Sequence, residues 1–250
     1  MDSADDTTDF GYREVPRGEK KRHVGAVFSS VAGRYDLMND LMSLGIHRLW
    51  KCFALELLDV RPGQSVLDLA GGTGDFSLAL ARRVGPNGRV LLADINAEML
   101  ARGRDRLLDA GLGAEVAVVR ADAERLPLAS GSLDRIVMAF GLRNVTDKSA
   151  VLAECRRVLR PGGLLAVLEF SRPTTAALGT LYDAWSFGAI PRIGRWVTGD
   201  EASYRYLVES IRRHPDQETL AGLFRAAGLE RVDVHNLSGG IVALHRGWSL

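Results

Sequence analysis

The amino-acid sequence predicts an α/β fold: a doubly wound, mostly parallel sheet covered by helices and ending in an antiparallel hairpin. Three observations support this prediction. Short apolar segments alternate with helical ones from residue 65 to residue 170, and such alternation implies parallel strands joined by right-handed crossovers. A glycine-rich turn follows the first strand. Two later strands are joined by Ser238-Gly239-Gly240, which is a tight hairpin signal.

The core strands are short apolar segments bounded by turn residues. They are expected at Ser65–Ala70, Arg89–Asp94, Glu115–Arg120, Leu133–Ala139 and Leu164–Phe170. The helices that connect and follow them are expected at Phe76–Val84, Ala97–Asp109, Lys148–Leu159, Thr175–Ile190, Ser203–Arg213 and Gln217–Ala227. The terminal hairpin pairs Arg231–Leu237 with Ile241–His245. One antiparallel strand is therefore expected at or near the edge of the sheet.

Pro62-Gly63 separates an N-terminal appendage, residues 1–60, from the sheet domain of residues 61–250. Within the appendage, residues 1–18 are expected to form a loose arm. Two helices should follow, His23–Val31 and Leu37–Leu58. They either roof a pocket over the glycine turn or are capped helices on the surface.

Lys20-Lys21-Arg22-His23 is a small basic cluster in the appendage. It is interpreted either as a solvated face or as a contact for anionic lipid.

The turn Gly71-Gly72-Thr73-Gly74 joins the first strand to a helix. Glycine permits a sharp turn, and a helix N-terminus offers free N–H groups to a nucleotide-like ligand. Asp94 ends the next strand, where an acid can bind ribose hydroxyls. We therefore predict an adenosine cofactor, with a loop that merely turns the chain as the alternative. The third glycine of a nicotinamide-type fingerprint falls on Ser77, which argues against NAD.

Two further segments follow strands at the same edge of the sheet. Asp122-Ala123-Glu124 comes after the third strand. It either caps a helix or lets Asp122, or the neighbouring backbone, accept a hydrogen bond from an adenine amino group. The fourth strand ends in Phe140–Asn144, which should lie over the reacting end of the cofactor.

Composition and charge exclude several classes of protein. The 250 residues are 46% hydrophobic, enough for one sizeable core. A formal net charge of +1 argues against nucleic-acid binding. Cys52 and Cys155 are far apart, which suggests reduced thiols in a cytoplasmic protein and no metal site. Neither a signal peptide nor an apolar run long enough to span a membrane is present.

Several segments resemble the ubiquinone/menaquinone biosynthesis C-methyltransferase family, whose members are class I, Rossmann-like methyltransferases that use S-adenosylmethionine. These segments cover the chain nearly end to end and are Phe28–Asp40, Gly45–Lys51, Leu67–Asp75, Phe140–Asp147, Pro191–Gly194, Ser203–Leu207 and Gly240–Gly247. The glycine turn alone would specify only the superfamily. The segment containing Arg143-Asn144 and the two flanking signatures are more specific.

The resemblance implies S-adenosylmethionine as cofactor. The residues then expected to bind it are Asp68, Gly71, Gly72, Thr73, Gly74, Asp94, Ile95, Asp122, Ala123 and Ala139. At Ala139 the sequence departs from similar family members, which carry Ser there. A side-chain hydroxyl is absent at this position, so we expect Ala139 to contact the cofactor through its backbone.

The implied reaction is methylation of a ring carbon of a polyprenylated quinol, either a demethylmenaquinol or a 2-methoxy-6-polyprenyl-1,4-benzoquinol. Loss of a proton from the ring hydroxyl activates the carbon, so a base or proton relay is required. We expect Arg143 to stabilise the forming phenolate, with a water accepting the proton, and Asn144 to orient the ring. Glu169 and Tyr35 are reserve candidates for the base. A structural ion pair is the alternative role for Arg143.

The aromatic residues Tyr182, Trp185, Phe187 and Trp196 either wall a site for the prenyl tail or are plain core, and Tyr204 and Tyr206 are ambiguous in the same way. Expected partners are the quinol, the inner face of the cytoplasmic membrane through peripheral contact, and a second copy or a quinone-biosynthesis complex. Three alternative functions remain: methylation of another lipid-like acceptor such as a sterol or small phenol, a nicotinamide dehydrogenase, and a non-catalytic quinol-binding subunit.

Overall fold

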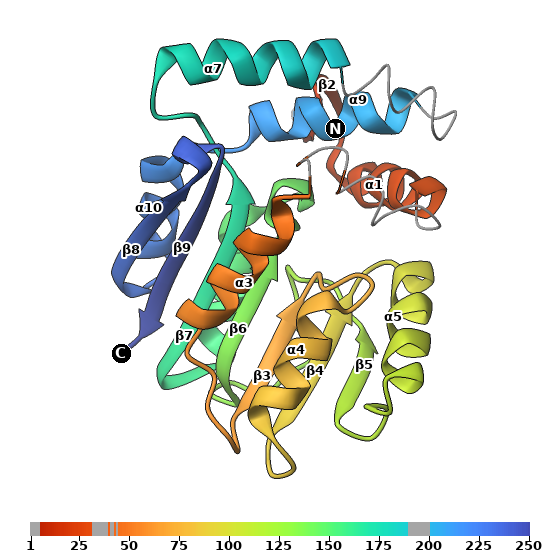
Figure 1. Ribbon diagram of the computed structural model, residues 1–250, viewed down its shortest axis with the longest axis vertical. Coiled ribbons are helices and arrows are strands. Elements are labelled where there is room, and N and C mark those ends of the chain that lie inside the picture. Colours follow the sequence, from red (N-terminus) through yellow and green to blue (C-terminus); the bar gives the residue numbers. More distant parts are fainter. Residues whose placement is uncertain (1–5, 32–39, 41–42, 44, 190–200) are drawn as a thin grey trace.

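The structure is a computed structural model that describes residues 6–31, 40, 43, 45–189 and 201–250. Its centre is a seven-stranded sheet with the order β5-β4-β3-β6-β7-β9-β8 (Figure 1). These strands are β3 Ser65–Leu69, β4 Arg89–Asp94, β5 Val116–Arg120, β6 Leu133–Ala139, β7 Leu159–Phe170, β8 Glu230–Leu237 and β9 Val242–Ser249. The first five in that order pair in parallel, and β9 is antiparallel to both β7 and β8. The doubly wound fold with its terminal antiparallel hairpin is confirmed.

Helices cover both faces of this sheet. They are α1 Arg17–Val31, α3 His47–Leu57, α4 Asp75–Val84, α5 Ala97–Asp109, α6 Lys148–Val158, α7 Ala176–Asp183, α9 Glu201–Arg213 and α10 Gln217–Ala226. Residues of α3, α4 and α5 join one hydrophobic cluster, and residues of α6 and α10 join a second. Because neighbouring strand residues point to opposite faces, Val66 of β3 belongs to the first cluster and Leu67 to the second.

The described residues before α1, 6–16, form regular structure, which corrects that part of the loose arm expected over residues 1–18. Residues Thr7–Phe10 (β1) and Arg13–Pro16 (β2) form an antiparallel hairpin. The Phe10 ring is buried and stacks on Tyr206 of α9, with 4.2 Å between ring centroids. Local composition predicted disorder because this stacking partner lies almost two hundred residues away in the sequence.

The two N-terminal helices also differ from their expected bounds. Helix α1 begins at Arg17 rather than His23. Of the second expected helix, Leu37–Leu58, the start at Leu37 lies outside the described residues, Asp40 and Ser43 are helical, and α3 covers His47–Leu57. Tyr35 lies outside the described residues. The domain boundary after residue 60 stays a prediction.

The C-terminal elements follow the sequence prediction with three larger differences, one of which is that β9 ends at Ser249 rather than His245. Strand β7 begins at Leu159 rather than Leu164, because Leu159 pairs with Leu133 of β6. The helix expected over Thr175–Ile190 is α-helical only to Asp183 and then continues as a π-helical segment, Ala184–Ala189. Strand β9 lies second from the edge of the sheet, between β7 and β8.

Candidate active site

The glycine turn after β3 adopts a left-handed backbone conformation that favours glycine. Gly72 and Gly74 have φ angles of +56° and +79°, which glycine adopts without the clash that a side chain would cause. A Cβ atom on Gly71 would lie 2.5 Å from Cγ of Asp68. Ala70 also has a positive φ, 53°, as does Phe140 at the end of β6, 57°. Strained backbone of this kind is concentrated at functional sites.

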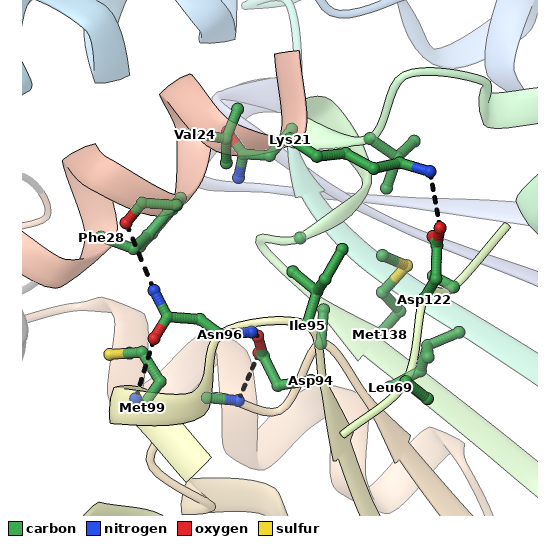
Figure 2. Close-up of a pocket in the computed structure, with 18 of the residues that line it drawn as sticks. Lys21, Val24, Phe28, Leu69, Asp94, Ile95, Asn96, Met99, Asp122 and Met138 are labelled. Carbon is green, nitrogen blue, oxygen red and sulfur yellow. Dashed lines mark hydrogen bonds and ion pairs between the residues drawn. The ribbon is translucent and has the colours of Figure 1, made fainter. Parts of the chain in front are cut away.

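A cavity of about 810 Å³, including its open mouth, lies at the carboxyl ends of β3, β4 and β6. Its apolar lining includes Leu69 and Met138, and α1 contributes Val24 and Phe28 from the opposite side (Figure 2). The first N-terminal helix therefore roofs the cavity, as one of the two interpretations of that segment predicted.

Asp94 reaches this cavity from the end of β4 (Figure 2). Its two carboxylate oxygens accept hydrogen bonds from Gly72 N at 3.0 Å and Asn96 N at 2.8 Å. Burial raises the pKa of Asp94, although these backbone donors oppose the shift. The carboxylate is thus held beside the glycine turn, where a ribose would have to lie.

Asp122 lies at another part of the cavity, beside Ala123. Its Oδ1 accepts a hydrogen bond from Glu124 N at 3.1 Å, so it stabilises the local turn as well as lining the cavity. Lys21 Nζ of α1 donates to Asp122 Oδ2 at 2.6 Å and to Glu124 Oε2 at 2.9 Å. Burial works to lower the pKa of Lys21, but the bonds to these two carboxylates raise it.

The basic cluster at residues 20–23 is only partly exposed to solvent, and its contact with anionic lipid stays a prediction. The Lys20 side chain is only 1% exposed and pairs with Asp9, while Lys21 lines the cavity. Arg22 is the exposed member. Sequence reasoning missed Lys21 as a site residue because local charge density does not reveal which carboxylates face it.

A smaller cavity adjoins the glycine turn and shares Ala70, Ala139 and Phe140 with the larger one. Asp68 and Thr73 are among its lining residues. Asp68 Oδ2 accepts hydrogen bonds from the backbone N and the hydroxyl of Ser77, and Oδ1 accepts none from the described residues. Burial raises the pKa of Asp68 to about 6, although the bonds from Ser77 oppose the shift.

The structure brings nine of the ten expected cofactor residues to these two cavities. Gly72, Asp94, Ile95, Asp122, Ala123 and Ala139 line the larger one, and Asp68, Gly71, Thr73 and Ala139 line the smaller one. Gly74 lines neither cavity and serves as the N-cap residue of α4.

Arg143 and Asn144 lie in a 3₁₀ turn after β6, Leu142–Asn144. Asn144 lines the larger cavity. The side chain of Arg143 is only 4% exposed and its Nη1 lies 2.7 Å from Glu169 Oε1. The alternative considered for Arg143, a structural ion pair, is thus present in the structure.

Of the aromatic residues considered for the tail site, those that the structure describes line neither cavity. Tyr182, Tyr204 and Tyr206 are buried in the core, and Trp185 packs against it. Trp196 and the side chain of Phe187 lie outside what the structure describes.

Comparison with known proteins assigns the chain to a family. A model of the ubiE/COQ5 methyltransferase family matches residues 16–249. The chain belongs to this family. It is 59% identical to the ubiquinone/menaquinone biosynthesis C-methyltransferase UbiE of Azotobacter vinelandii, over 96% of this chain and 95% of that protein. The protein of the same name from Stutzerimonas stutzeri is 58% identical over 98% and 95% of the two chains.

Solved structures share the fold. A methyltransferase from Thermotoga maritima, described as S-adenosylmethionine-dependent and a possible histamine N-methyltransferase, matches with a TM-score of 0.65 at 22% identity, over 91% of this chain and 100% of that one. An S-adenosylmethionine-dependent methyltransferase from Aquifex aeolicus matches with a TM-score of 0.59 at 20% identity, over 80% and 89%. The fold is that of class I methyltransferases, and the family member described here is an S-adenosylmethionine-dependent C-methyltransferase.

The residues of the two cavities fit this cofactor. Asp94 offers carboxylate oxygens to a ribose diol, and Asp122 offers an acceptor to an adenine amino group. The absence of a Cβ at Gly71 and Gly72 leaves room beside these groups. Oδ1 of Asp68, which accepts no hydrogen bond from the described residues, suits the ammonium group of the methionine moiety. When bound, S-adenosylmethionine supplies an electrophilic methyl group.

Proposed function

We propose that the protein methylates a ring carbon of a polyprenylated quinol, converting a demethylmenaquinol to a menaquinol, a 2-methoxy-6-polyprenyl-1,4-benzoquinol to its 5-methyl product, or both. Family membership and the names of the similar UbiE proteins, ubiquinone/menaquinone biosynthesis C-methyltransferases, support this acceptor class. The observation in the structure that carries the proposal is Asn144, a polar side chain that lines the larger cavity from the turn after β6.

Asn144 is held in one orientation by its neighbours. Its Oδ1 accepts a hydrogen bond from the hydroxyl of Tyr206 at 3.1 Å, and its Nδ2 donates to Phe140 O at 3.4 Å. Tyr206 is in turn fixed by its stacking on Phe10. A side chain oriented in this way can position a ring hydroxyl without first losing rotational freedom. We assign to Asn144 the role of orienting the quinol ring.

Arg143 is proposed to stabilise the forming phenolate through a water molecule. Arg143 precedes Asn144 in the chain but lines neither cavity, and its buried Nε has no acceptor among the described residues. Buried donors without a protein acceptor usually bond to water. Arginine stays protonated at neutral pH, so it would act as a positive charge that favours transfer of the ring proton to water.

Glu169, a reserve candidate for the base, is already engaged. Its Oε1 accepts from Arg143 Nη1 at 2.7 Å and from Phe170 N at 2.9 Å, and its Oε2 accepts from Arg143 N at 3.2 Å. We therefore assign it the role of holding Arg143. Removing either partner of a buried pair leaves an uncompensated charge in the core, so replacement of Asn144 is the cleaner test of the site.

The test is transfer of a labelled methyl group from S-adenosylmethionine to each reduced acceptor in parallel, with a small phenol and a sterol as comparison acceptors. Asn144→Ala should lower the turnover number by about tenfold to hundredfold while S-adenosylhomocysteine binding changes little. Asn236→Ala, at an exposed asparagine of β8, is the matched control. Label in the phenol or sterol but in neither quinol would overturn the proposed acceptor, and the ratio of the two quinol products identifies the pathway.

We also propose that the protein is cytoplasmic and contacts the membrane peripherally, because a polyprenyl tail resides in lipid. Among the described residues, no helix is long and apolar enough to cross a bilayer. Three apolar residues at helical spacing are exposed: Ile46, the N-cap residue of α3, by 40%, and Leu49 and Phe53 within α3 by 70% and 37%. Such a stripe can insert into the lipid interface. Assembly with a second copy or with other quinone-biosynthesis enzymes stays a prediction.

Flotation with anionic liposomes tests the membrane proposal. Leu49→Asp should reduce the floating fraction severalfold, because a charge at the centre of the stripe disfavours insertion. Leu108→Asp on α5, where the leucine is 58% exposed, is the matched control and should float like the parent protein. A parent protein that remains wholly in solution would contradict the proposal.

A further inference from the structure

The smaller cavity beside the glycine turn contains a lysine that the cofactor assignments above leave without a ligand. Lys51 lines it from helix α3, together with Asp68, Thr73 and Asp75. Since this cavity shares Ala70, Ala139 and Phe140 with the larger one, a ligand that occupies the larger cavity can extend into the smaller one.

Lys51 shares its ion-pair partner with a second cation, in a cavity that also contains Asp68. Asp75 Oδ2 lies 2.7 Å from Lys51 Nζ, and Asp75 Oδ1 lies 2.8 Å from Nη1 of Arg106. One carboxylate is therefore shared by two cations. Burial works to raise the pKa of Asp75, but Lys51 and Arg106 outweigh it and lower that pKa. Asp75 thus stays ionised and cannot neutralise both partners.

Lys51 also has N–H donors that make no hydrogen bond with the described residues. A lysine ammonium carries three N–H donors, and among the described residues Lys51 gives a hydrogen bond only to Asp75. Its side chain is 17% exposed, so the group is sheltered but reachable from the cavity. A sheltered cation in this position can form a charge-assisted hydrogen bond with an anion.

The cofactor has one anionic group, the α-carboxylate of its methionine moiety. Asp94 and Asp122 suit its ribose and adenine, and Asp68 suits its ammonium group. In the larger cavity, Lys21 already pairs with two carboxylates, so it is a poor partner for a third. We propose that Lys51 binds the α-carboxylate of S-adenosylmethionine, and that Asp75 and Arg106 hold the lysine in place.

This inference rests on the cofactor and is independent of the quinol acceptor. It is tested by binding measurements with two ligands, S-adenosylhomocysteine and 5′-methylthioadenosine. Both contain the adenosine and the thioether, but the second lacks the amino-acid group. Calorimetry should show that Lys51→Met weakens S-adenosylhomocysteine binding by about tenfold to hundredfold and leaves 5′-methylthioadenosine binding unchanged. Unchanged binding of the second ligand also shows that the variant is folded.

Two further variants complete the test. Lys51→Arg keeps the positive charge and should retain most of the affinity for S-adenosylhomocysteine. Arg48→Met removes an exposed cation from the same helix and should leave both affinities unchanged. The proposal would be overturned if Lys51→Met lost affinity for both ligands equally, or lost affinity for neither. If that variant does not fold, binding of decarboxylated S-adenosylmethionine to the parent protein decides: the proposal requires it to bind more weakly than S-adenosylmethionine.

Discussion

Two lysines of the N-terminal helices line the two cavities, Lys21 the larger and Lys51 the smaller, and they differ in how their ion pairs are shared. Lys21 of α1 is a single cation between two carboxylates, those of Asp122 and Glu124. At the other end, Lys51 and Arg106 are two cations that share Asp75. The difference shows that the number of partners, rather than the residue type, decides whether a lysine closes a site or is free to bind a ligand.

The arrangement matches the polarity of the cofactor. The acid-rich end suits the amino group of an adenine, which donates hydrogen bonds. The cation-rich end, with Asp68 nearby, suits an amino-acid group that carries both charges. S-adenosylhomocysteine carries the amino-acid group and 5′-methylthioadenosine lacks it, so a comparison of their affinities separates the contributions of the two ends.

The largest effect is expected between the two ends, at Asp94. Asp94→Asn replaces one acceptor oxygen by an amide nitrogen, which would face the N–H of Gly72 or of Asn96. We expect S-adenosylhomocysteine and 5′-methylthioadenosine to lose about hundredfold in affinity alike, since both contain the ribose. Calorimetry checks this, and a loss confined to one ligand would contradict the assignment of Asp94 to the ribose.

A smaller, pH-dependent effect is expected at the cation-rich end. Because burial raises the pKa of Asp68 to about 6, its carboxylate is charged above that pH and protonated below it. The ammonium of S-adenosylhomocysteine then loses its partner as the pH falls, and we expect its affinity to drop about tenfold between pH 7 and pH 5. The affinity for 5′-methylthioadenosine should stay constant over that range.

Asp68→Asn is the control for this titration, because an amide does not ionise. The variant should bind S-adenosylhomocysteine with an affinity that changes little between pH 7 and pH 5. A drop of the same size in the variant would mean that another group titrates and that Asp68 does not contact the ammonium.

The smallest effect is expected at the acid-rich end. Lys21→Met removes the cation that ties α1 to Asp122 and Glu124, but the lysine side chain is 37% exposed and solvent screens the pair. We expect the affinities for both ligands to fall equally, by about twofold to fivefold, because both ligands contain the adenine. Arg22→Met, one residue further on the exposed side of α1, should have no effect. A loss of affinity for S-adenosylhomocysteine alone would place the amino-acid group at this end.

The agreement between prediction and structure differs by region, for a physical reason. The helices α4, α5, α6 and α10 lie within a residue of their expected bounds, because caps, glycines and hydrophobic periodicity are local signals. The hairpin of β1 and β2 was missed, because its stability comes from Phe10 on Tyr206. A pattern read over a short window cannot detect a partner that distant in sequence.

The site shows the same division. The sequence alone determined the glycine turn, the acids at strand ends and hence the cofactor class, because parallel strands bring their carboxyl ends to one edge of the sheet. Only the tertiary structure decided that Arg143 is paired with Glu169, and that Lys21 and Lys51 line two adjoining cavities. Charge pairing depends on distances between separate elements, and those distances exist only once the helices have packed on the sheet.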